Sequence, residues 1–76
     1  GDGTALVHGM KKPFRIQYEP RSSREETWST DSSRQFATAT PAADAAPWSA
    51  RFYRRRNWRV INLATGEVVA EGPAAR

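Results

Sequence analysis

The stretch WRVINLATGEVVAEG, residues 58–72, has the pattern of a β-hairpin. WRVIN and EVVAE are rich in β-branched residues, and LATG between them supplies a tight turn in which Gly66 is free to adopt a positive φ. Side chains alternate between the two faces of a strand, and both faces of WRVIN carry apolar residues. This strand is therefore either central in a sheet or meets a partner on one face, and we expect Trp58 to be buried in the core.

A second β signal lies near the beginning of the chain. KPFRIQYEP, residues 12–20, alternates apolar and polar side chains with a period of two, which predicts a half-buried strand bounded by prolines. ETWST, residues 26–30, is a second strand candidate with Trp28 toward the core. These two strands are expected to form an antiparallel hairpin.

The segment TPAADAAPWSARFYRRR, residues 40–56, predicts the helix. Thr40 suits the N-cap, and the proline after it suits the first helical position. Pro47 would remove a backbone hydrogen bond within a helix, so either the helix bends there or it starts near Ala46. We expect a well-formed helix over 47–56, with 41–46 also helical.

The element order is therefore β-β-α-β-β. It predicts a small single α+β domain, with an antiparallel sheet of about four strands and one helix packed on one face. Phe52 is expected beneath the helix in the core, where its replacement by alanine would cost about 3–5 kcal/mol. The domain is placed at residues 10–72, followed by a frayed C-terminal tail at 73–76. GDGTALVHG, residues 1–9, has no periodicity and is interpreted as a disordered expression-vector leader, with a disordered native tail as the alternative.

Composition limits the classes of function. The 76 residues contain 12 Lys and Arg against 8 Asp and Glu, for a net charge of +4, and they contain no cysteine. The absence of cysteine excludes a disulfide framework and thiolate metal sites, and it fits a reducing compartment, so a cytoplasmic location is expected. No apolar run approaches the roughly 18 residues that a membrane span needs, so no membrane partner is expected.

Groups suited to catalysis are scarce. His8 is the single histidine and lies in the suspected leader. Glu25 and Glu26 are adjacent, so they would face opposite ways in a strand. Because no usual base can activate a serine and no phosphate-binding glycine loop is present, we expect no enzyme activity, no cofactor and no metal site.

Arginines dominate the run RFYRRRNWRVIN, residues 51–62, and no acidic residue occurs between Asp44 and Glu67. On a continuous helix the first three of these arginines would lie within about 100° of arc. The candidate nucleic-acid-binding residues are Arg51, Arg54, Arg55, Arg56 and Arg59. The alternative is an ordinary solvated helix face, whose cations favour the negative end of the helix dipole.

Two strands followed by QFATATPAADAAPW, residues 35–48, resemble the arm-type DNA-binding domain of phage tyrosine integrases over roughly residues 14–52. The resemblance implies contact with DNA. Two further strands follow the helix here and are lacking in that family, so none of its functional residues is carried over. The sequence thus predicts a DNA- or RNA-binding module, and the alternative is a phage or mobile-element protein-interaction module that docks by a sheet edge or an aromatic patch.

Overall fold

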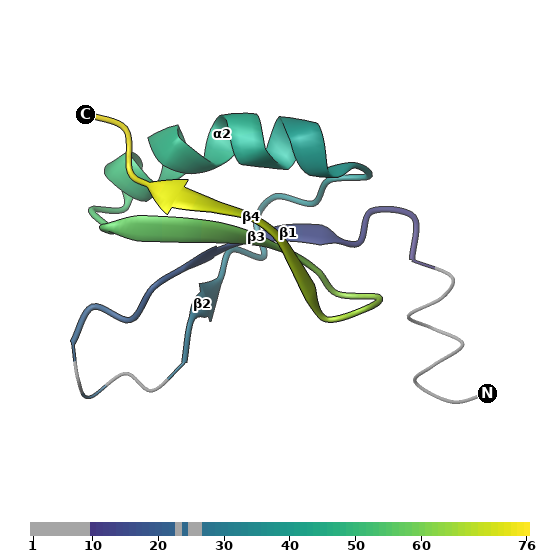
Figure 1. Ribbon diagram of the computed structural model, residues 1–76, viewed down its shortest axis with the longest axis horizontal. Helices are drawn as coiled ribbons and strands as arrows, with labels where there is room; N and C mark the ends of the chain where they lie inside the picture. Colours follow the sequence, from purple (N-terminus) through teal and green to yellow (C-terminus); the bar gives the residue numbers. More distant parts are fainter. Residues whose placement is uncertain (1–9, 23, 25–26) are drawn as a thin grey trace.

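The computed structural model describes residues 10–22, 24 and 27–76 (Figure 1). The elements are β1 (Phe14–Tyr18), β2 (Ser29–Thr30), α2 (Ala39–Phe52), β3 (Asn57–Asn62) and β4 (Glu67–Pro73). The strands form one antiparallel sheet in the order β2-β1-β3-β4, with α2 lying across one face. The predicted α+β class and β-β-α-β-β order are confirmed. The suspected leader, residues 1–9, lies outside the described residues.

The core forms where β1 and β3 pair at the centre of the sheet. Ile16 lies opposite Val60, and Tyr18 lies opposite Trp58. Ile16 and Val60 are completely buried and Trp58 is only 7% exposed, so the predicted burial of Trp58 is confirmed. Large side chains on the sheet therefore supply most of the apolar volume between the two layers.

Alanines supply the helix side of the same interface. Ala42, Ala46 and Ala50 are completely buried and recur every four residues, which makes one stripe along α2. Phe52 lies about 200° around the helix axis from Ala50, and its side chain is 79% exposed. The prediction that Phe52 packs in the core is therefore wrong, because the small residues rather than the aromatic ones face the sheet.

The helix also differs from its predicted bounds. It covers Ala39–Phe52, so the helical prediction for 41–46 is confirmed and the helix continues through Pro47. The N-cap is Thr38 rather than Thr40, and the helix ends at Phe52 rather than at residue 56. Proline inside a helix costs a backbone hydrogen bond. The buried alanine stripe continues on both sides of Pro47, and this packing offsets the loss.

A Schellman-type turn ends α2. The Arg54 N–H donates to the Arg51 carbonyl at 3.1 Å, and the Arg55 N–H donates to the Ala50 carbonyl at 2.8 Å. Arg54 adopts a φ of 56°, in the left-handed region that this motif requires and that glycine usually occupies. The arginines after residue 53 are thus outside the helix, because the backbone turns there to enter β3.

The sheet face without the helix carries Trp28. Gln17 pairs with Thr30 and with Arg59 across the neighbouring strands, which sets these side chains opposite the core face. The Arg59 guanidinium carbon lies 4.3 Å from the centre of the Trp28 ring, on this face. The prediction that Trp28 points into the core is wrong, because Ser29 is the residue that pairs with Tyr18 of the core face, and its chain neighbour Trp28 points to the opposite side.

The chain after β4 folds back toward α2 (Figure 1). The Ala74 N–H donates to the Arg56 carbonyl at 2.8 Å, and the Ala75 N–H donates to the Pro47 carbonyl at 2.9 Å. Ala74 also packs against the core. This arrangement differs from the frayed tail predicted for 73–76, and the reason is that α2 and the turn after it offer carbonyl groups within reach of the strand end.

Candidate nucleic-acid interface

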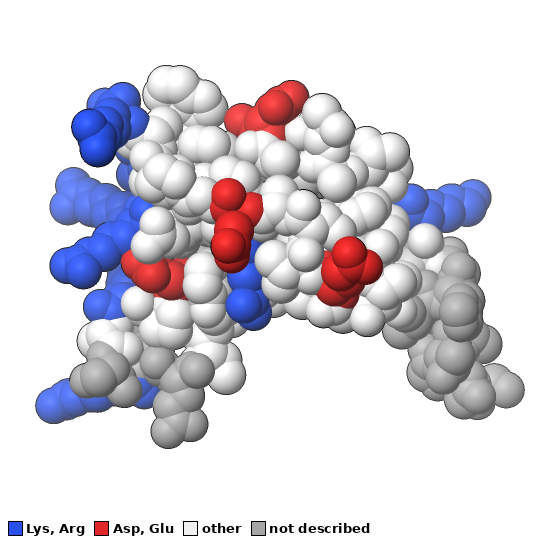
Figure 2. Space-filling model, in the orientation of Figure 1, with Lys and Arg blue, Asp and Glu red and all other residues white. Residues whose placement is uncertain are grey.

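Arginine side chains gather at the end of the molecule where α2 stops and β3 starts. Figure 2 shows basic side chains projecting from this end, while acidic side chains lie over the middle of the face in view. The arginine end is defined as Arg21, Arg51, Arg54, Arg55, Arg56 and Arg76. Guanidinium groups concentrated in this way create a positive local potential that attracts anions.

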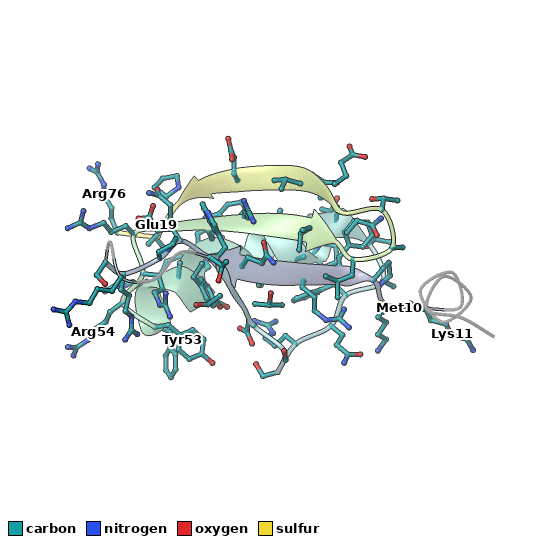
Figure 3. All side chains as sticks on the ribbon, turned by 90° about the horizontal axis from the view of Figure 1, so that it is seen from below. Met10, Lys11, Glu19, Tyr53, Arg54 and Arg76 are labelled. Carbon is teal, nitrogen blue, oxygen red and sulfur yellow. The ribbon has the colours of Figure 1, made fainter. Side chains whose placement is uncertain are left out.

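A surface hollow of about 380 Å³ lies within the arginine end. Its lining residues are Glu19, Pro20, Arg21, Arg54, Arg55 and Arg56. Glu19 and Arg54 lie at the same end of the sheet in Figure 3. The hollow therefore combines several guanidinium groups with the Glu19 carboxylate, which offsets part of their charge and leaves a net positive lining.

The exposed members of the candidate set come from different local structures. Arg51 lies in the last turn of α2, and its Nη1 donates to the Arg76 carbonyl at 2.9 Å. Arg54 sits at the left-handed position of the helix end, and Arg56 follows in the turn before β3. All three side chains are exposed, so they remain accessible to a ligand from solvent.

Arg55 has a mainly structural position. Its side chain is half-buried, its Nη1 donates to the Glu19 carbonyl at 3.0 Å, and its guanidinium lies 5.8 Å from the Tyr18 ring centre. The predicted common helix face of Arg51, Arg54 and Arg55 does not exist, because α2 ends at Phe52. The backbone turn brings these residues to the same end of the molecule instead.

Arg59 is separated from the other candidates. It lies on the helix-free face of the sheet, where it stacks on Trp28 and its Nε donates to Gln17 Oε1 at 2.7 Å. The guanidinium is thereby held in the sheet surface and helps to anchor Trp28. Arg59 is therefore no part of the arginine end, although it follows closely in sequence.

The sequence interpretation missed Arg21 and Arg76, which are distant from the arginine-rich run. Arg21 Nη2 donates to the Tyr53 carbonyl at 3.0 Å, and this bond ties the loop after β1 to the end of α2. Only the antiparallel pairing of β1 with β3 brings the chain after Tyr18 beside the chain before Trp58. No local pattern in the sequence signals such a long-range approach.

Close to the arginine end, the buried Tyr18 is paired with the half-buried carboxylate of Asp31. The Tyr18 hydroxyl donates to Asp31 Oδ2 at 2.8 Å, and burial followed by this hydrogen bond raises the pKa of Tyr18 well above its usual value. Burial alone would raise the pKa of Asp31, but hydrogen bonds from Ser33 and Tyr18 outweigh burial and hold that pKa below its usual value. Both groups therefore keep one protonation state near neutral pH and act as supports.

The strained helix end leads to a stability prediction. Replacing Arg54 with glycine is expected to raise the free energy of unfolding by roughly 0.5–1 kcal/mol, because a left-handed backbone costs a residue with a Cβ more than it costs glycine. Urea unfolding would measure the change. Arg56→Gly is the matched control, since φ at Arg56 is not positive, and it is expected to lower stability. A loss of stability in Arg54→Gly would contradict this account of the turn.

Three further findings bear on the class of the protein. Within the described residues, no group of three or more His, Cys, Asp or Glu side chains is placed to hold a metal ion. α2 is too short and too polar to cross a membrane, and the described part of the chain has no other candidate helix for a span. Comparison with protein-family models, curated proteins and solved structures found no significant match to this chain.

Proposed function

We propose that this chain is a small non-enzymatic binding module that contacts the nucleic-acid backbone through the arginine end. The observation that carries the proposal is the hollow of about 380 Å³ lined by Arg21, Arg54, Arg55 and Arg56. Guanidinium groups donate fixed pairs of hydrogen bonds that match phosphate oxygens. A polyanion is the ligand class that this chemistry fits.

The arginines differ in how firmly the protein holds them, and this difference supports the proposal. Arg55 is anchored by the Glu19 carbonyl, and Arg21 is anchored by the Tyr53 carbonyl, so both keep their charge near the hollow without leaving the protein surface. Arg51, Arg54 and Arg56 are exposed around them. Anchored charges set the local potential, while the exposed side chains can adjust to successive phosphates.

Backbone strain at Arg54 is a second observation in favour of a binding site here. A glycine would be more stable at a φ of 56°, yet the sequence has an arginine there. Sparsely populated backbone conformations often occur at binding sites, where the side chain is needed in that position. The strain supports a ligand role for the Arg54 guanidinium.

The salt dependence of binding tests the proposal. If the module neutralises about four phosphates of duplex DNA, log K should fall with log salt at a slope of roughly −3.6. Between about 50 and about 200 mM salt the affinity should then drop roughly 150-fold. Fluorescence anisotropy with a labelled duplex of mixed sequence would measure both quantities.

A pair of matched variants locates the contact. Arg51→Ala with Arg56→Ala should weaken binding to every sequence alike and flatten the slope by roughly 1.8, at about 0.9 per phosphate. Lys11→Ala with Lys12→Ala removes the same number of charges from exposed positions next to Met10, and Figure 3 shows Lys11 far from Arg54. This control should bind as the parent protein does.

Docking to another protein is the competing function. The outer edge of β4 could accept a strand, and Val68 and Val69 are exposed there. That edge also carries Glu67 and Glu71 and an irregularity in its pairing opposite Val60 and Ile61, and both features disfavour strand addition. If the folded protein bound neither DNA nor RNA at low salt, the nucleic-acid proposal would fail and protein docking would replace it.

A further inference from the structure

Three aromatic residues on the solvent side of α2 form an exposed apolar surface. This aromatic surface is defined as Trp48, Phe52 and Tyr53, which are 61%, 79% and 40% exposed. Phe52 and Tyr53 meet edge to face, with ring centres 5.0 Å apart. The core is built without Trp48 and Phe52, so their exposure is unexplained by the stability of the fold and indicates a binding surface.

The aromatic surface lies directly beside the arginine end. Arg51 precedes Phe52 in the chain and Arg54 follows Tyr53, and Figure 3 places Tyr53 and Arg54 next to each other at the same end of the molecule. Two exposed rings, Phe52 and Tyr53, thus lie between Arg51 and Arg54 in the chain. A ligand that contacts one group can therefore reach the other.

A second hollow, of about 310 Å³, lies along the aromatic surface. Its lining residues are Asp31, Arg34, Ala45, Trp48, Ser49, Phe52 and Tyr53. Arg34 is one of the lining residues and donates from Nη1 to Ser49 Oγ at 3.4 Å. Asp31 accepts hydrogen bonds from Tyr18 and Ser33 and is engaged within the protein. Arg34 and Asp31 thus border the rings with opposite charges, and the surplus of positive charge comes from Arg51 and Arg54, which flank Phe52 and Tyr53 in the chain.

We infer that the aromatic surface and the arginine end together bind single-stranded nucleic acid, an inference that rests on the proposed contact with phosphates. Bases in a duplex are stacked on each other and cannot reach rings on the outside of a helix. Bases in a single strand can stack on Trp48 and Phe52 while their phosphates contact the flanking arginines. Every base has a π-face, so this contact tolerates different sequences.

Charge complementarity favours this occupant over a protein. Aromatic residues and arginine are enriched at protein interfaces too, so the choice of occupant rests on the surplus of positive charge beside the rings. Here Arg51 and Arg54 flank Phe52 and Tyr53, an arrangement that suits a ligand with anionic and aromatic groups side by side. A single strand is such a ligand, because each nucleotide carries both a phosphate and a base.

A comparison of three labelled probes tests the inference. The probes are an oligothymidine of about 15 nucleotides, an abasic oligomer of equal length and charge, and a duplex of equal length. The oligothymidine should bind about 5- to 100-fold more tightly than the abasic oligomer, since stacking contributes on this scale for each base. Equal binding to the oligothymidine and the abasic oligomer would overturn the inference.

Substitutions of the aromatic residues test whether their rings cause the preference for oligothymidine over the abasic oligomer. Trp48→Ala with Phe52→Ala should weaken oligothymidine binding about 5- to 100-fold and should remove most of its advantage over the abasic oligomer. Val68→Ala with Val69→Ala trims exposed apolar side chains on β4 and should leave both affinities unchanged. An unchanged preference for oligothymidine in the aromatic variant would contradict the stacking contact.

The outcomes distinguish recognition of a single strand from contact with phosphates in general. Equal binding to all three probes, with a steep salt dependence, would retain phosphate contact and reject single-strand recognition. Absence of binding to all three probes at low salt, with the circular dichroism spectrum of a folded protein, would reject the proposed function itself. Quenching of tryptophan emission by oligothymidine, abolished in Trp48→Phe, would further support stacking on this ring.

Discussion

Replacing Trp58 with alanine is expected to lower the free energy of unfolding by about 3–5 kcal/mol. The ring is 7% exposed and lies across β4, where a Cβ on Gly72 would come within 3.0 Å of Trp58 Cζ2. Its Nε1 donates to the Pro73 carbonyl at 2.8 Å. Removing the indole therefore leaves a cavity and an unpaired carbonyl, and it also loosens the strand that the ring covers.

Such a loss is a large part of the total stability. A domain of this length is stabilised by about 4–11 kcal/mol, at roughly 0.05–0.15 kcal/mol per residue. The variant should therefore melt at a much lower temperature or be partly unfolded at room temperature, and thermal unfolding followed by circular dichroism would show it.

Trp48→Ala is the matched control for this variant. It removes the same side chain from the exposed face of α2, where the indole is 61% exposed, and it should change stability by less than about 0.5 kcal/mol. Equal effects of the two substitutions would contradict the described placement of the helix on the sheet.

Replacing Ile16 with alanine is expected to cost about 2–5 kcal/mol. Ile16 is completely buried between β3 and the alanine stripe of α2, and its partner across the strands is Val60. The helix side of this interface consists of small residues, so no neighbouring long side chain can relax into the cavity. Denaturant unfolding would give the change in free energy.

Phe52→Ala is the informative comparison for Ile16→Ala. The sequence pattern predicts a loss of about 3–5 kcal/mol for this substitution, as for a buried phenylalanine. The exposed ring leads to the opposite expectation, a change of less than about 0.5 kcal/mol. A large loss of stability in Phe52→Ala would mean that the aromatic side of the helix faces the core. It would contradict the burial of the alanine stripe.

The strands could be predicted because their signals are local. The alternation at 14–18 specifies one strand, the turn residues between 58 and 72 specify a hairpin, and the structure has β1, β3 and β4 at these places. The helix could be predicted only approximately. Aromatic residues are usually the best guide to a buried face, but a sheet that already carries Ile16, Tyr18 and Trp58 leaves room only for alanines opposite them.

The positive charge of the candidate site could be predicted from the sequence, but the positions of its arginines could not. The run without acids between Asp44 and Glu67 correctly indicates a basic region. The position of each arginine depended on backbone geometry that no periodicity reveals. A left-handed residue at Arg54 ends α2 early, and the strand alternation turns Arg59 to the opposite face of the sheet.

Local sequence patterns were enough to predict the fold class, the order of the elements and the basic character of the region after the helix. These properties follow from local periodicity, turn residues and charge, which act over a few neighbouring positions. The tertiary structure alone decided which helix face is buried, where the helix ends and how Arg21 and Arg76 join Arg54. These properties depend on contacts between residues far apart in the chain, so they exist only once the sheet has formed and the helix has packed against it.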